Sequence, residues 1–258
     1  MLGSTATRRV DLRTLRSSCR QCPIAELCLP LELDAGEIDA LERIVQHNVL
    51  LRQNDILYDE NERFSALFMV RSGAMKIVSS ATGGDSRILG FFLPGEMLGF
   101  EGLSSGAHVC QAIALQTTSV CRIPFDELHR LAGTLPGLRY QLLRMMSRKH
   151  FAGPRSLDGM TGRPAGQRLA ATLLSLADRY GRQGLSRTRF VLPMSRGDLA
   201  NYLGLSPATL SRVFARFRQW GWIRDARNDI LLEDVDNLAA FAGAALDSID
   251  AQDAQLCR

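Results

Sequence analysis

The region between Val49 and Phe125 constrains the fold of this chain most strongly. Short apolar runs there, such as 66–70 and 75–78, are separated at close intervals by sequences typical of turns: Arg71-Ser72-Gly73, Gly83-Gly84-Asp85, Pro94-Gly95 and Ser105-Gly106. Runs this short suit strands better than helices, and glycine-rich breaks suit the turns between antiparallel strands. The sequence therefore predicts an antiparallel barrel or sandwich in this region.

Helical patterns flank the predicted strands. Asp34, followed three residues later by Glu37, is typical of an N-cap with a capping box, and the helix it begins places apolar residues on one face, namely Ile38, Leu41 and Val45. After Phe125, apolar residues recur at helical spacing, namely Leu138, Leu142, Met145 and Met146. This second helix can pack against the barrel or against a second subunit. Gly153-Pro154 predicts that it breaks near Ala152, because an interior proline removes a backbone donor.

A helix-turn-helix is predicted in the last third of the chain. Ser195 suits the cap of a helix over 196–203, and Gly204 supplies the turn. Ser206 and Pro207 suit the N-cap and first position of a second helix that reaches about Trp220. Apolar residues hold the two helices together: Leu199, Leu203, Leu205, Leu210, Val213, Phe214 and Phe217. Residues 220–223 and 230–232, with a turn between them, predict a small hairpin wing.

The start of the second helix is the part of such a motif that meets base edges in the major groove. The DNA-binding residues predicted from it are Ser206, Pro207, Ala208, Thr209, Ser211, Arg212 and Arg216. Arg212 can read guanine with two hydrogen bonds, Ser211 can contact a base or a phosphate, and Arg216 and Arg218 are better placed for the backbone.

The distribution of charge supports a nucleic-acid partner. Between Arg163 and Asp229 the chain has twelve Arg and four Asp but no Lys or Glu, a net charge of +8, whereas the whole chain carries only +4. A concentrated arginine excess of this kind favours phosphate binding over an ordinary solvated surface.

Residues 1–18 are expected to be disordered, and a loop that contains three cysteines is expected to follow. These cysteines have the spacing C-x2-C-x5-C: Cys19, Cys22 and Cys28. Closely spaced cysteines in a reducing compartment are more typical of metal ligands than of disulfides. Cys121 lies in a β-branched stretch that ends at Pro124, and folding can bring it near the other three as a fourth ligand. Cys110 is interpreted as a small buried apolar residue, and Cys257 lies in the terminal tail.

Four thiolates suit a structural zinc ion or an iron–sulfur cluster, and the spacing does not separate these alternatives. It is unlike the paired C-x2-C units of a zinc ribbon, which favours iron and sulfur. A thiol-redox switch without metal is a further alternative. His108, a lone loop histidine, is interpreted as structural or solvated rather than as a ligand.

Other functional classes find little support. The sequence has no phosphate-binding glycine loop followed by Lys-Ser/Thr, no His-Glu-x-x-His and no nucleophile elbow, so we expect no enzyme. The first residues are polar and arginine-bearing, and no later run is long and apolar enough to cross a bilayer, so a cytoplasmic protein is expected.

The order of these parts resembles the CRP/FNR superfamily of bacterial transcription regulators, and the cysteines resemble its FNR (fumarate and nitrate reduction regulator) branch. The stretches that carry the resemblance are 19–30, 95–100, 120–125 and 195–206. The resemblance implies an α+β fold: an N-terminal β-roll (a cupin-like antiparallel barrel) as sensor, a connecting dimerisation helix and a C-terminal winged helix-turn-helix. The corresponding boundaries are 1–33 for the cysteine segment, 34–125 for the β-roll, 126–163 for the helix region and 164–258 for the DNA-binding domain.

The resemblance also implies a function. Cys19, Cys22, Cys28 and Cys121 would hold an oxygen-labile [4Fe–4S] cluster that fixes the dimerisation helix, and its loss in air would weaken dimerisation and DNA binding. The cluster-bound homodimer would bind a two-fold symmetric operator with half-sites resembling TTGAT and control genes of anaerobic metabolism as an activator or a repressor. Contact with RNA polymerase would involve the turn at 83–85, which a plain hairpin explains as well.

Two departures from superfamily patterns stand in the sequence. FNR-type recognition helices carry Glu-x-x-Ser-Arg, but Ala208 occupies the glutamate position here, so a carboxylate that accepts from cytosine is missing. Cyclic AMP-binding members pair a Gly-Glu turn with a phosphate-binding arginine. Gly95-Glu96 matches the turn, whereas residues 102–109 contain no arginine, so no cyclic nucleotide ligand is expected.

Overall fold

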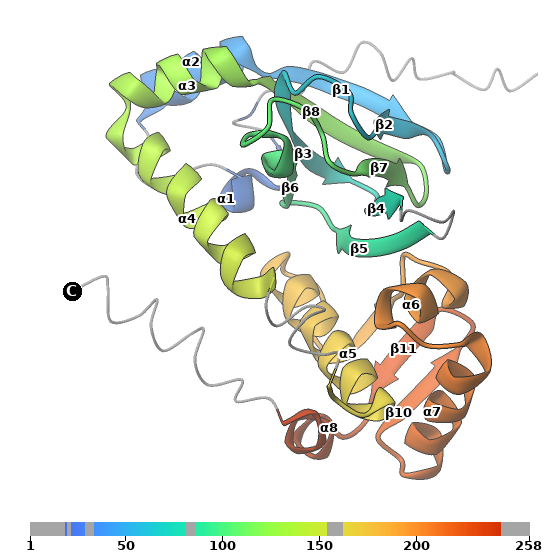
Figure 1. The fold of residues 1–258 in the computed structure, drawn as a ribbon. Helices are drawn as coiled ribbons and strands as arrows, with labels where there is room; N and C mark the ends of the chain where they lie inside the picture. The colour runs from blue at the N-terminus through green and yellow to red at the C-terminus, as the bar shows by residue number, and fades with distance from the viewer. Residues whose placement is uncertain (1–18, 20–21, 29–33, 81–85, 154–161, 244–258) are drawn as a thin grey trace, which may run out of the picture.

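The computed structural model describes residues 19, 22–28, 34–80, 86–153 and 162–243. Four sequence predictions fall outside these residues: the disorder expected for 1–18, the turn at 83–85, the role of Pro154 and that of Cys257. The described chain consists of a β-rich N-terminal part, a long helix and a mainly helical C-terminal part (Figure 1).

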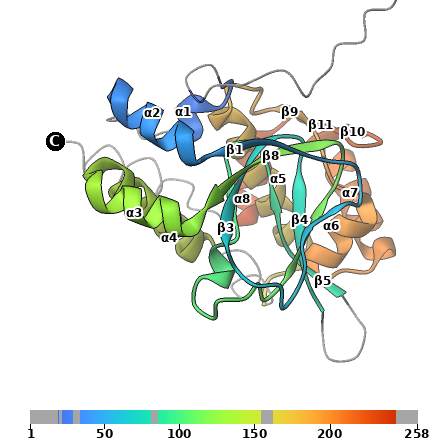
Figure 2. The same cartoon turned by 90° about the horizontal axis from the view of Figure 1, so that it is seen from above.

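Within the described residues, the N-terminal part contains two four-stranded antiparallel sheets (Figures 1 and 2). One sheet has the order β1-β8-β3-β6 and the other the order β2-β7-β4-β5. The strands are β1 (Gln46–Leu51), β2 (Ile56–Tyr58), β3 (Ala66–Ser72), β4 (Met75–Ser80), β5 (Ser86–Phe92), β6 (Met97–Leu98), β7 (Gln111–Ala114) and β8 (Thr118–Pro124), with a 3-10 turn, η2 (Phe100–Gly102), after β6. The antiparallel fold predicted from the turn spacing is confirmed.

Strands β3 and β8 are buried on both faces, which creates two separate cores. Successive side chains of a strand point to opposite faces. Phe68 and Val120 therefore pack between the two sheets, whereas Met69 and Cys121, which are paired across the strands, point to the outer face. The outer face is where the cysteine segment packs.

Four helices contribute to the core on this outer face: α1 (Ala25–Cys28), α2 (Ala35–Ile44), α3 (Phe125–Thr134) and α4 (Pro136–Gly153). The predicted capping box of α2 is confirmed, because Asp34 accepts a hydrogen bond from the Glu37 amide at 2.8 Å and Glu37 accepts one from the Asp34 amide at 2.9 Å. The cysteine segment was expected to be a loop throughout. This expectation is wrong for α1, a single helical turn closed by the Cys28 amide donating to the Ile24 carbonyl at 3.0 Å.

The long helix α4 is described up to Gly153, and the predicted break at Pro154 lies outside the described residues. The next helix, α5 (Ala165–Arg182), begins after a non-helical stretch at Gly162–Pro164. The two helices are therefore not one continuous rod.

The C-terminal part is a winged helix-turn-helix. Its remaining elements are β9 (Arg189–Val191), α6 (Arg196–Leu203), α7 (Pro207–Gln219), β10 (Ile223–Ala226), β11 (Asp229–Leu232) and α8 (Val235–Ala242). Strands β10, β11 and β9 form a small antiparallel sheet in that order. Local chemistry sets the motif as predicted: Ser195 and Ser206 cap the two helices, and Gly204 ends the first with φ of 61°. The wing differs in one detail, because Trp220 caps α7 and the first wing strand starts only at Ile223.

Candidate functional site

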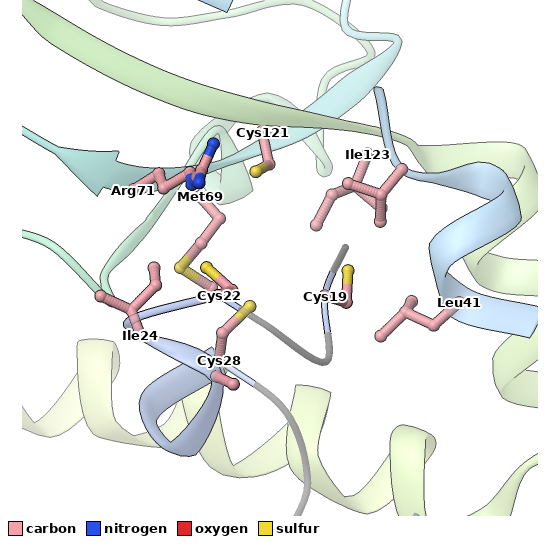
Figure 3. A pocket seen from close by; sticks show the side chains of 11 residues that line it. Cys19, Cys22, Ile24, Cys28, Leu41, Met69, Arg71, Cys121 and Ile123 are labelled. Carbon is pink, nitrogen blue, oxygen red and sulfur yellow. The ribbon is translucent and has the colours of Figure 1, made fainter. Parts of the chain in front are cut away.

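Four cysteines border one cavity on the outer face of the β-roll (Figure 3). Cys121 reaches it from β8, and Cys19, Cys22 and Cys28 reach it from the N-terminal segment and α1. The other lining residues are mainly apolar: Ile24, Ala25, Leu41, Val45, Met69, Arg71 and Ile123. The structure thus brings together the four cysteines that the sequence selected.

Backbone hydrogen bonds hold the N-terminal cysteines in place. The Cys22 amide donates to the Cys19 carbonyl at 3.3 Å, and the Ala25 amide donates to the Cys22 carbonyl at 3.0 Å. The Cys19 amide donates to the Glu42 carboxylate on α2 at 3.2 Å. Turns within the segment and the contact of the Cys19 amide to α2 therefore hold the described cysteines at the pocket.

The electrostatics of the pocket disfavour free thiolates. Burial raises the pKa of Cys19 to about 12, with further increases from Glu42, Cys121 and Cys22 and an opposing effect of Arg71. Burial also raises the pKa of Cys28, and the neighbouring thiols raise it further. Four thiolates in this apolar pocket require a cationic centre to balance their charge.

The donor set suits a soft, thiophilic centre. All potential ligands among the lining residues are sulfurs, without a carboxylate or imidazole, which excludes the oxygen-rich coordination preferred by calcium or magnesium. Within the described residues, however, no three His, Cys, Asp or Glu side chains are arranged to hold a single metal ion. An iron–sulfur cluster takes one thiolate per iron, so its ligands need not converge on one point. The residues fit such a cluster in kind and number.

Two charged residues at the pocket were not found from the sequence: Arg71 lines it, and Glu42 accepts a hydrogen bond from Cys19. Glu42 and Arg71 modify the charge around Cys19 from α2 and from β3, and no motif near the cysteines indicates either of them. The two other potential ligands lie apart from the pocket. Cys110 is buried between the sheets, and His108 stacks on Tyr58 with ring centroids 3.8 Å apart, so both are structural as expected.

Helix α4 contacts the same core as the cysteines with one face and exposes the other. Leu142 and Met145 pack against the core that contains Cys19 and Cys121. Other positions of the helix expose large apolar side chains, namely Tyr140 (58%), Leu143 (58%) and Met146 (39%). An exposed apolar row beside a buried one is typical of a helix that also packs against a partner.

The second candidate site is the start of α7. Pro207, Ala208, Ser211 and Arg212 are exposed, whereas Leu210 and the other predicted contact residues of the helix pair pack in the core or against it. A local network orders this end of the helix. The Ser206 hydroxyl accepts from the Thr209 amide at 3.1 Å and donates to the Thr209 hydroxyl at 2.9 Å.

The arginines of this region differ in what already holds them. Arg212 donates only a weak contact to the Thr209 hydroxyl at 3.3 Å, and Arg216 lies 5.7 Å from the Trp220 ring. Arg218 is paired with Asp225 at 2.8 Å, so it is less free for the DNA backbone than the sequence suggested. Arg212 is thus the arginine best placed for a base edge.

Comparison with known proteins identifies the two domains. A model of the cyclic nucleotide-binding domain matches residues 48–134, and a model of the Crp-like helix-turn-helix domain matches residues 167–241. The transcriptional activator protein FnrA of Stutzerimonas stutzeri is 40% identical over 240 residues, which span 93% of this chain and 98% of FnrA. The chain belongs to the CRP/FNR family.

A second relative and a solved structure extend the similarity. The fumarate and nitrate reduction regulatory protein of Escherichia coli K12 is 35% identical over 236 residues, or 92% of this chain and 94% of that protein. The structure of FixK2 from Bradyrhizobium japonicum has a TM-score of 0.70 at 27% identity and covers 77% of this chain and 98% of FixK2. This CRP/FNR-family chain is therefore a DNA-binding transcription regulator rather than an enzyme. Within the described part, no helix combines the length and apolarity needed to cross a bilayer.

Proposed function

We propose that this chain is an oxygen-responsive regulator of the FNR type, in which Cys19, Cys22, Cys28 and Cys121 hold a [4Fe–4S] cluster. The observation that carries the proposal is the shared cavity of these four cysteines (Figure 3). The raised pKa values of Cys19 and Cys28 support it, because thiolates in that pocket need a cationic partner. The names of the relatives, an FnrA activator and a fumarate and nitrate reduction regulator, point the same way.

The arrangement of the chain explains how such a site controls DNA binding. When bound, the cluster supplies an oxygen-labile cross-link among four thiolates. Cys121 sits on a buried strand, so three cysteines of the N-terminal segment are held against a fixed point. Leu142 of α4 packs on the same core, and the exposed face of α4 provides the surface for a second copy. Release of the segment removes support from α4 and weakens the homodimer, and with it the paired half-site contacts.

The proposed partners follow from the same arrangement. The homodimer binds a two-fold symmetric operator with half-sites resembling TTGAT, with Arg212 on guanine, and Ala208 leaves the usual cytosine contact unmade. It acts in the cytoplasm on genes of anaerobic metabolism, together with RNA polymerase, as an activator like the relatives so named.

Anaerobic purification tests the cluster. We expect brown protein with about four iron and four sulfide per chain that bleaches on exposure to air. Cys121→Ala should abolish the colour, whereas Cys110→Ala, the matched control, removes a buried cysteine outside the pocket and should keep it. Equal iron and sulfide in the two variants would contradict the assignment.

The same preparation distinguishes the alternatives. A colourless, air-stable protein with one zinc per chain would indicate that the cysteines hold a structural zinc ion and not a cluster. A metal-free protein whose DNA binding responds reversibly to thiol oxidants would indicate a redox switch. DNA binding through α7 is common to all three alternatives.

A further inference from the structure

The DNA-binding domain contacts an unpaired strand edge of the β-roll. Among the strands that the structure describes, β5 lies at the end of its sheet, with no strand paired to its outer side. Asn201 on α6 fills this place: its amide oxygen accepts from the Ile88 amide at 2.7 Å, and its amide nitrogen donates to the Ser86 carbonyl at 2.8 Å. The side chain thus pairs with the edge much as another strand would.

A partly buried ion pair joins the same two parts. Arg179 on α5 donates from Nε and Nη2 to the Glu96 carboxylate at 2.7 and 2.6 Å, and Nη2 also donates to the Phe91 carbonyl at 2.7 Å. Burial by itself lowers the pKa of Arg179, but the attraction of Glu96 outweighs it and leaves the pKa raised. Bidentate pairs of this kind fix orientation as well as distance. Glu96, which the sequence offered as part of a nucleotide-binding turn, is engaged here by the DNA-binding domain.

A third contact and an apolar seam complete the interface. Lys76 on β4 donates to Asp198 on α6 at 2.6 Å. The Phe91 ring lies 5.1 Å from the Tyr202 ring, and Ile88 belongs to the same apolar core as the buried residues of α5 and α6. The interface therefore combines directional polar contacts with shared apolar burial.

The interface leaves the DNA-reading surface free. Helix α6 lies toward β5, and α7 lies on its far side (Figure 1). Ala208, Ser211 and Arg212 remain exposed. Because α4 and α5 are not one continuous helix, α4 alone does not determine the orientation of α7.

We propose that Arg179, Asp198 and Asn201 clamp the DNA-binding domain to the β-roll and thereby hold the recognition helix in the orientation that binds the operator. The proposal rests on DNA binding through α7 and is independent of what the cysteines hold. Release of the clamp leaves each domain folded but adds orientational freedom that DNA binding must then remove.

The exchange of the Ile88 amide measures clamping without DNA. In Arg179→Gln, which leaves the Asn201 contact chemically intact, we expect Ile88 to exchange at least about tenfold faster, since separation of the domains breaks the hydrogen bond of its amide to Asn201. Arg182→Gln is the matched control, because Arg182 lies on the same helix but pairs with Asp178 of that helix at 3.1 Å. Glu96→Gln breaks the same ion pair without changing the DNA-binding domain. It therefore controls for the possibility that Arg179→Gln acts by unfolding that domain.

Operator affinity provides the second readout, measured anaerobically by anisotropy on a duplex with two inverted TTGAT half-sites. We expect about tenfold weaker binding by Arg179→Gln and by Glu96→Gln, but not by Arg182→Gln. Unchanged Ile88 exchange in both clamp variants would overturn the clamp, and faster exchange with equal or tighter binding would overturn its role in DNA binding. A wild-type protein that binds no duplex would contradict DNA recognition through α7, while Ile88 exchange still tests the clamp.

Discussion

Replacement of Arg212 by alanine tests the DNA-reading surface most directly. The side chain is exposed at the start of α7. Its guanidinium donates to the Thr209 hydroxyl at 3.3 Å, a long hydrogen bond within the helix that a hydrogen bond to a base can replace. By contrast, Arg218 is already paired with Asp225, so a matched Arg218→Ala variant should lose less.

The expected magnitude follows from the contact that Arg212 can form. A bidentate arginine–guanine pair contributes about 1–3 kcal/mol of discrimination, which corresponds to roughly 5- to 150-fold in Kd. Because this contact reads a base, the loss should fall on the operator and much less on unrelated duplex. The salt dependence of binding should change little, since phosphate contacts determine it.

Fluorescence anisotropy under anaerobic conditions measures this loss on three duplexes. The first carries inverted TTGAT half-sites, the second carries 7-deazaguanine in place of the half-site guanines, which removes the N7 acceptor, and the third has an unrelated sequence. If Arg212 reads guanine, Arg212→Ala and the modified base each weaken binding by removing the same contact. Combining the variant with the modified duplex should then weaken binding little more than either change alone. Fully additive losses, or an equal loss on unrelated duplex, would refute the assignment.

Three further predictions concern stability, assembly and pH. Phe217→Ala should destabilise the DNA-binding domain by about 3–5 kcal/mol, because the buried ring packs among aromatic side chains; both tryptophans of the chain lie in that cluster, so their fluorescence should report a lower denaturant midpoint, with a smaller shift for Phe217→Leu. Leu143→Asp, on the exposed face of α4, should lower the dimer fraction in light scattering while anaerobic colour persists, and an unchanged mass would count against the α4 interface. Burial raises the pKa of Asp198, but hydrogen bonds from Lys76 and Ser195 outweigh it and leave the pKa below the ordinary 3.8. The ionised carboxylate therefore stabilises the fold fully above pH 3.8, and this stabilisation is lost as the pH falls through the lower pKa of the folded state. Asp198→Asn should remove this acid-dependent step from a plot of unfolding free energy against pH.

Local chemistry made much of the fold predictable. Ser195, Gly204 and Ser206 each form capping hydrogen bonds with residues three or four positions away, so the sequence next to each helix end indicates where it begins or stops. The same holds for the Asp34 capping box and for the turns between the strands of the β-roll. The cysteine pocket was also predictable in its members, because Cys121 lies on a recognisable strand.

Contacts between distant residues were not predictable in this way. Arg179 and Glu96 are far apart in sequence, and neither neighbourhood indicates the other. Glu42 and Arg71 likewise approach Cys19 only through tertiary packing. The wing strand was placed too early because apolar residues at the end of α7, such as Trp220, resemble a strand when their cap is not known.

Because β8 is buried on both faces, Cys121 is held more firmly in the fold than the three N-terminal cysteines of the pocket. Val120 anchors the strand in the core between the sheets, so Cys121 on its other face belongs to a part of the molecule that opens only with the whole β-roll. By contrast, the N-terminal cysteines lie on short turns with local backbone hydrogen bonds and a contact from Cys19 to Glu42. Whatever the four thiols hold, loss of that group should therefore release the N-terminal cysteines while the β-roll stays folded.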